Sequence, residues 1–158
     1  MKQIMKFLVV LCCMMLLTSQ ATKAQCRDLD TKELAEMLNT EKKAGVQNDS
    51  LFTAYFNTCG LQYGQLPNGH REMGFHKKYT LNGKSYTMTV SFRPIDSDKG
   101  ENHRLIRITT GEHGTWWWMI LRLQAFGMNM KEGQGDFHDL KGKGLFAGTG
   151  SNSLTIGY

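Results

Sequence analysis

The chain has little proline and little cysteine, and it lacks the common catalytic signatures. Of its 158 residues only two are Pro and four are Cys. It contains no Gly-x-Ser-x-Gly elbow, no His-Glu-x-x-His pair and no phosphate-binding loop. These absences give no support to serine hydrolases, zinc peptidases or P-loop nucleotide enzymes. The length leaves room for a single compact domain.

A strong positive field is also missing. The first 24 residues hold three Lys and no acid, so the remaining 134 residues carry 16 basic against 14 acidic side chains. Their net charge is +2, compared with +5 for the whole chain. Because nucleic-acid binding needs clustered positive charge, we expect no nucleic-acid partner.

No apolar run is long enough to form a stable membrane span. The longest, Phe7–Leu17, has 11 residues and would extend ~16 Å as a helix, about half of the ~30 Å hydrocarbon core. Lys2 and Lys6 precede it, and small and polar residues follow, a pattern typical of a secretory signal peptide. We therefore expect residues 1–24 to be the signal peptide. Two positions satisfy the small-x-small rule for cleavage, Ala21 and Ala24.

Residues 25–158 are then a single exported domain, periplasmic or secreted, with two cysteines, Cys26 and Cys59. Two cysteines in an oxidising compartment most often pair with each other. The bridge would close a loop of about 33 residues and stabilise the domain by roughly 3 to 4 kcal/mol. We therefore predict a Cys26–Cys59 disulfide.

Helical signals follow directly after Cys26. Asp30 is placed as an N-cap with Glu33 three residues later, and Gly45 supplies a stop, which predicts a helix over residues 31–44. A second helix, capped by Asp49 or Ser50, is predicted from the apolar face of the following residues, and Gly60 ends it. A short connection makes the two helices antiparallel, which brings Cys26 near Cys59.

From residue 71 the hydrophobic period changes to two. Asn82-Gly83 lies between two alternating runs and predicts a β-hairpin with a two-residue turn. That turn fixes the register. The pairs on the apolar face are Tyr79 with Tyr86, Lys77 with Met88, Phe75 with Val90 and Met73 with Phe92.

A second hairpin is predicted from a strand at residues 104–110, a turn at 111–114 and a strand at 115–126. Pairing Thr110 with Thr115 directs Trp117 into the core. The opposite face then carries two indoles, two guanidinium groups and an imidazole, from Trp116, Trp118, Arg107, Arg122 and His103. Trp and Arg are enriched at the energetic centres of protein interfaces. We therefore predict a binding surface there.

The remaining stretch, residues 127–158, is rich in Gly, and we expect loops joining one or two short strands. The fold expected for the whole domain is α+β, an N-terminal antiparallel helix pair packed on a mostly antiparallel β-sheet of four to six strands.

Two groups of residues resemble metal sites, but neither has the geometry or ligands that a metal needs. His70 and His76 would lie ~20 Å apart on an extended strand, too far to share an ion. The acidic turn at residues 96–102 resembles a calcium loop, but Arg107 stands where the closing Glu belongs. We expect neither a metal nor a cofactor.

The leading hypothesis is an exported, non-catalytic module that binds a protein partner, as an inhibitor or immunity-type protein that neutralises an extracytoplasmic enzyme or toxin. Alternatively, the same Trp/Arg face holds a glycan or an amphiphile. The enzyme alternative is a small cysteine hydrolase acting on cell-wall peptides, built from Cys59, His103 and either Gln124 or His113. Against it, Cys59 lies at a predicted helix C-terminus, where the dipole raises the pKa of a thiol.

Overall fold

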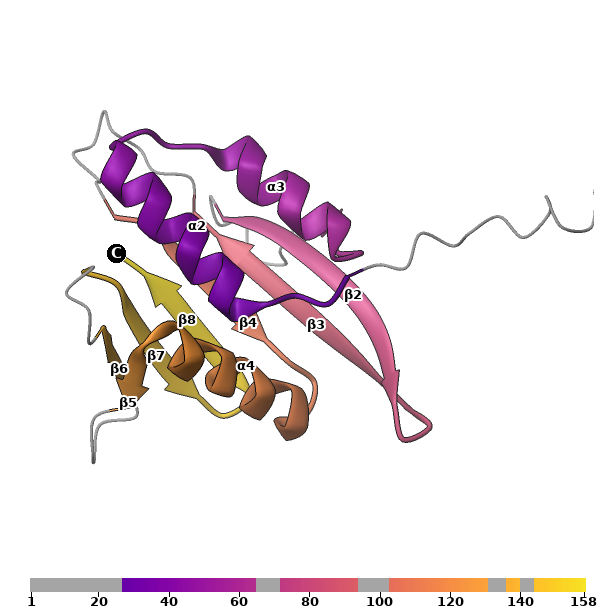
Figure 1. Cartoon of the computed structure of the whole chain (residues 1–158). Helices are drawn as coiled ribbons and strands as arrows, with labels where there is room; N and C mark the ends of the chain where they lie inside the picture. The colour runs from indigo at the N-terminus through magenta and orange to yellow at the C-terminus, as the bar shows by residue number, and fades with distance from the viewer. Residues whose placement is uncertain (1–26, 65–71, 94–102, 131–135, 140–143) are drawn as a thin grey trace, which may run out of the picture.

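The structure, a computed structural model, describes residues 27–64, 72–93, 103–130, 136–139 and 144–158. These ranges form three helices and one antiparallel sheet of eight strands in the order β1-β2-β3-β4-β8-β7-β6-β5. Six of those strands have four residues or more, whereas β1 and β5 have three each. The helices lie over one face of the sheet (Figure 1). The predicted α+β class, with a helix pair before the sheet, is confirmed.

Helix α2 (Thr31–Ala44) has the predicted bounds and caps. The Asp30 carboxylate accepts a hydrogen bond from the Lys32 N–H at 2.9 Å, which satisfies one of the free donors of the first turn. At the other end Gly45 adopts φ 62°, the left-handed conformation that closes a helix. The buried face, which includes Leu34 and Leu38, packs toward the sheet.

Helix α3 (Asp49–Thr58) is capped by Asn48 and not by the predicted Asp49 or Ser50. Figure 1 shows it running antiparallel to α2, as predicted. The Tyr55 hydroxyl donates to the Asp30 carbonyl at 3.0 Å, and the Arg27 N–H donates to the Thr58 carbonyl at 3.3 Å. The start of α2 therefore lies beside the end of α3.

The long hairpin of β2 (Met73–Leu81) and β3 (Lys84–Phe92) has the predicted register throughout. Asn82 and Gly83 both have positive φ, 51° and 75°, as a type I′ turn requires. Strand β1 (Gln62–Gly64) pairs only with residues 74–76 of the hairpin. On its other side, the hairpin pairs through residues 89–92 with β4 (Leu105–Thr109). The turn half of the hairpin therefore extends beyond the sheet.

Residues 115–126, predicted as a strand, form most of helix α4 (His113–Phe126), so that prediction is wrong. Met119, Ile120, Leu123 and Phe126 are all buried, and their spacing matches one helix face. The Glu112 carboxylate caps the helix by accepting from the N–H groups of Gly114 at 2.5 Å and Thr115 at 2.7 Å. Tertiary burial of this face outweighs the β-propensity of the three tryptophans.

The C-terminal stretch is more regular than predicted, because four strands follow α4 in the described ranges. They are β5 (Met128–Met130), β6 (Asp136–Asp139), β7 (Phe146–Gly150) and β8 (Ser153–Gly157). Strand β8 pairs with β4 and joins this half of the sheet to the N-terminal hairpin.

Candidate ligand-binding cavity

The three tryptophans of α4 point in different directions. Trp116 packs against the core and its indole N–H donates to the Ser153 carbonyl at 3.0 Å, which ties α4 to β8. Trp117, predicted to be buried, is 44% exposed, and Trp118 is 40% exposed. A helix turns successive side chains by about 100°, so the predicted alternation of inward and outward indoles is wrong.

Arg107 does not share a surface with Trp118, so the prediction that places both on one face is also wrong. Arg107 is exposed on β4, between Ile106 and Ile108, which are buried beneath the helices. Because neighbouring residues of a strand point to opposite faces, Arg107 lies on the face away from α4. His103 is exposed and precedes β4, so it lies outside helix α4, which carries the three tryptophans. The predicted five-residue binding face therefore does not form.

Trp118 and Arg122 are brought together, by helical spacing and not by strand pairing. The Arg122 guanidinium lies 6.0 Å from the centre of the Trp118 ring. The same guanidinium donates to both carboxylate oxygens of Asp30, with the shortest contact at 2.6 Å. Burial opposes the charge on Asp30, but the hydrogen bonds from Arg122 and the Lys32 N–H outweigh it and lower the pKa of this carboxyl. Arg122 therefore anchors α4 to the start of α2.

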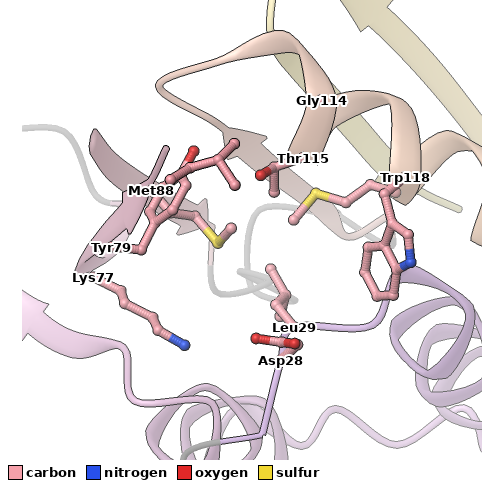
Figure 2. Close-up of a pocket in the computed structure, with 10 residues that line it drawn as sticks. Asp28, Leu29, Lys77, Tyr79, Met88, Gly114, Thr115 and Trp118 are labelled. Carbon is pink, nitrogen blue, oxygen red and sulfur yellow. The ribbon is translucent and has the colours of Figure 1, made fainter. Parts of the chain in front are cut away.

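A cavity of about 440 Å³ lies between the hairpin, the first turns of α4 and the segment before α2. We call it the Lys77 cavity. Figure 2 shows the side chains of these three segments pointing toward one space. Its lining residues are Asp28, Leu29, Lys77, Tyr79, Leu81, Met88, Gly114, Thr115, Trp118 and Met119.

The Lys77 cavity is mainly apolar, with its polar groups confined to a few positions. Leu29, Met88 and Met119 are buried and form its floor. The Lys77 ammonium is half-buried and donates to the Cys59 carbonyl at 2.9 Å. An ammonium carries three donors, so two remain for a ligand or water. Pockets of this size and composition are typical small-molecule sites.

A second polar position lies where the hairpin meets the start of α4. The Tyr79 hydroxyl donates to a Glu112 carboxylate oxygen at 3.4 Å. Burial, assisted by the charge of Glu112, raises the pKa of Tyr79, so it keeps its proton as a donor. Burial opposes the charge on Glu112, but hydrogen bonds from Thr115 and Gly114 outweigh it and lower the pKa of Glu112. Glu112 therefore stays ionised while it caps α4.

Cys59 is fully buried beside this cavity, with its sulfur 3.8 Å from the Asp28 carbonyl oxygen. Burial raises the pKa of this thiol, which makes it a weak nucleophile at neutral pH. Its predicted disulfide partner, Cys26, lies outside the described residues, so the bridge stays a prediction. His113, one of the histidines considered for a hydrolase, packs against Trp116 with ring centres 4.7 Å apart and ring planes tilted by 31°.

Neither a metal cluster nor a spanning helix is found in the described part of the chain. No group of three or more His, Cys, Asp or Glu side chains there is arranged to hold an ion. None of the described helices has the length and apolar character needed to cross a bilayer.

Trp118 is the one cavity residue that the sequence analysis predicts as a binding residue, although Lys77 also stands in an unusual place. The predicted register puts Lys77 on the hairpin face shared by Phe75 and Met88, and the structure confirms this. A lysine on an otherwise apolar face marks a site where a charge is kept near the core. The opposite wall of the cavity comes from α4. Because the sequence pattern there predicts a strand, it does not predict the cavity.

Comparison with known proteins gives no match, since no family model, no curated protein and no solved structure is similar to the chain.

Proposed function

We propose that this protein is an exported, non-catalytic binding module that holds a small anionic amphiphile in the Lys77 cavity. The observation that carries the proposal is a cavity of about 440 Å³ with apolar walls and one half-buried ammonium. Export rests on the predicted signal peptide at residues 1–24.

The apolar part of the ligand fits among the thioether and aliphatic side chains of Leu29, Met88 and Met119, with the Trp118 indole as one wall. Moving apolar surface out of water supplies most of the binding free energy. Unbranched methionines adapt to chains and rings of different shape, which suits an amphiphile better than one rigid substrate.

The acidic head group is assigned to Lys77. Its ammonium is held in place by the Cys59 carbonyl, so it is already ordered before the ligand arrives. Asp28 lies at the same rim, as Figure 2 shows. Asp28 is exposed whereas Lys77 is half-buried, so water screens the carboxylate more than the ammonium. The net preference at the rim is for an anion.

The inhibitor and immunity hypothesis depends on a sheet face that carries both Arg107 and Trp118. These two residues lie on different sides of the sheet, so that support is gone. The cysteine hydrolase alternative depends on a thiol that is buried and has a raised pKa. The amphiphile alternative is supported by Trp118, which lines an apolar cavity together with the cation Lys77.

Calorimetric titration with decanoate below its micelle concentration tests the proposal. We expect saturable binding to one site, with Lys77→Met weakening it roughly ten- to a hundredfold, because a hydrogen bond to a charged group is worth about 1.5 to 3 kcal/mol. The matched control is Lys78→Met, since Lys78 is the next residue and points to the other face.

Two ligands with the same chain test the head group. Decyltrimethylammonium reverses its charge, and decyl glucoside removes the charge and adds a sugar. We expect both to bind more weakly than decanoate. Tighter binding of decyl glucoside that persists in Lys77→Met would favour the glycan alternative over the anionic amphiphile. No binding of decanoate would contradict the proposal.

A further inference from the structure

An exposed apolar surface continues outward from the Lys77 cavity. Leu81 at the hairpin turn is 39% exposed, and on α4 Trp117, Trp118 and Leu121 are 44%, 40% and 45% exposed. Leu81 and Trp118 line the same cavity, so the hairpin and the helix contribute to one surface. Figure 1 shows the hairpin turn and the start of α4 at the same end of the molecule. We call the surface formed by Leu81, Trp117, Trp118 and Leu121 the hairpin end.

The charges of the hairpin end are mostly of one sign. From Met73 to Arg93 the sequence has no Asp or Glu and contains three lysines, Lys77, Lys78 and Lys84. From His113 to Phe126 it has one basic residue, Arg122, and no acid. Two acids border this surface, Asp28 and Glu112, and the Glu112 carboxylate is engaged with the first N–H groups of α4.

We infer that the hairpin end docks on an anionic lipid bilayer, with Leu81, Trp117, Trp118 and Leu121 entering the interface. Lys84, which pairs with Leu81, and Lys78, on the other face of the hairpin, then face lipid phosphates. Indole rings favour the head-group region of a bilayer, and leucine favours its apolar edge. Lysines can lay their stems along apolar surface while their ammonium groups reach the phosphates. Each lysine near an anionic surface strengthens binding about fivefold.

The charge favours a bilayer over a second copy of this chain. A two-fold dimer built on this surface would place the lysines of one copy near those of the other, which is unfavourable. An anionic bilayer would instead attract the same lysines.

Docking would also place the opening of the Lys77 cavity near the lipid. Leu81 and Trp118 form part of both the cavity and the exposed surface. An amphiphile could then pass from the bilayer into the cavity without crossing water. The docking itself does not depend on the proposed function, because Trp117 and Leu121 lie outside the cavity lining.

Co-sedimentation with vesicles tests the inference. We expect the protein to bind vesicles of equal parts phosphatidylcholine and phosphatidylglycerol, and to bind pure phosphatidylcholine at least tenfold more weakly. The double variant Lys78→Gln/Lys84→Gln should lose about 25-fold in affinity for the mixed vesicles, and Trp117→Gln/Leu121→Gln roughly tenfold.

The matched control is Val46→Ser/Leu51→Gln, which changes two apolar residues, 64% and 45% exposed, near the other end of the helix pair. It should bind mixed vesicles like the unmodified protein. Equal binding by all variants, or no binding to mixed vesicles, would overturn the inference. Concentration-dependent dimerisation that Trp117→Gln/Leu121→Gln abolishes would also overturn it, in favour of a second copy.

The decanoate titration separates this inference from the proposed function. Trp117→Gln/Leu121→Gln should keep its decanoate affinity, since neither side chain lines the Lys77 cavity. Loss of vesicle binding with decanoate binding intact supports the docking surface. Loss of both indicates that α4 has been disturbed, and the Lys78→Gln/Lys84→Gln variant, which leaves α4 unchanged, then decides.

Discussion

Arg104 and Lys77 are both cations on the helix-covered side of the sheet, and the structure surrounds them differently. Arg104 is fully buried, with Glu41 accepting from its Nε at 2.5 Å and Asp49 in an ion pair at 2.7 Å. Its guanidinium also lies 4.9 Å from the centre of the Phe52 ring. Lys77 has one backbone acceptor and opens onto an apolar cavity.

The buried charge of Arg104 therefore stabilises the fold, whereas the charge of Lys77 remains free to bind a ligand. Burial alone would lower the pKa of Arg104, but Glu41 and Asp49 outweigh it and raise the pKa, so the residue stays charged. The C-terminal Tyr158 joins the cluster by donating to Glu41 at 2.8 Å. Burial and the Glu41 charge raise the pKa of Tyr158 to about 12. The Arg104 cluster thus has charged partners, whereas Lys77 has none among the described residues.

The largest effect is expected where the Arg104 cluster is broken. Arg104→Met leaves Glu41 buried without its cation and should cost about 3 to 5 kcal/mol of unfolding free energy, measured by urea denaturation. Arg27→Gln breaks the exposed pair with Glu33 and should cost at most about 1 kcal/mol. Equal costs for the two variants would mean that burial does not set the strength of these pairs.

A smaller loss of stability is expected when Gly157, which is tightly packed, or Gly83, which is open to solvent, is replaced by alanine. A Cβ at Gly157 would lie 2.2 Å from the Arg104 carbonyl oxygen, so Gly157→Ala should cost about 1 to 3 kcal/mol through overpacking. Gly83, at the hairpin turn, has no atom within 4 Å of such a Cβ. Its φ of 75° alone makes Gly83→Ala cost about 1 kcal/mol. Thermal unfolding of both variants checks the order, and a larger loss for Gly83→Ala would reverse it.

The sequence predicts some elements of the fold and not others. The caps Asp30 and Gly45 and the turn Asn82-Gly83 were sufficient to predict α2 and the hairpin register, because each is a local conformational rule. Helix α4 was missed because its cap, Glu112, is not a favoured N-cap residue and the tryptophans favour strands. The cavity depends on α4 packing beside the hairpin, a long-range contact that no local pattern encodes.

The smallest effect concerns the Asp30–Arg122 contact that holds α4 at the cavity. The pKa of Asp30 is lowered in the folded state, so its stabilisation is present at neutral pH and is lost as the pH falls through the acidic range. Asp30→Asn keeps a capping side chain and should cost about 1 kcal/mol at neutral pH. The cost should shrink toward pH 3, as measured by urea denaturation across pH. A cost independent of pH would show that the ion pair contributes nothing.

Intermolecular nuclear Overhauser effects between bound decanoate and the protein show whether the ligand occupies the Lys77 cavity. We expect contacts from the alkyl chain to the Met88 and Met119 methyl groups and to the Trp118 indole, with the carboxylate end nearest Lys77. Contacts to Leu105 or Phe146 on the other face of the sheet, without contacts to these groups, would contradict this expectation.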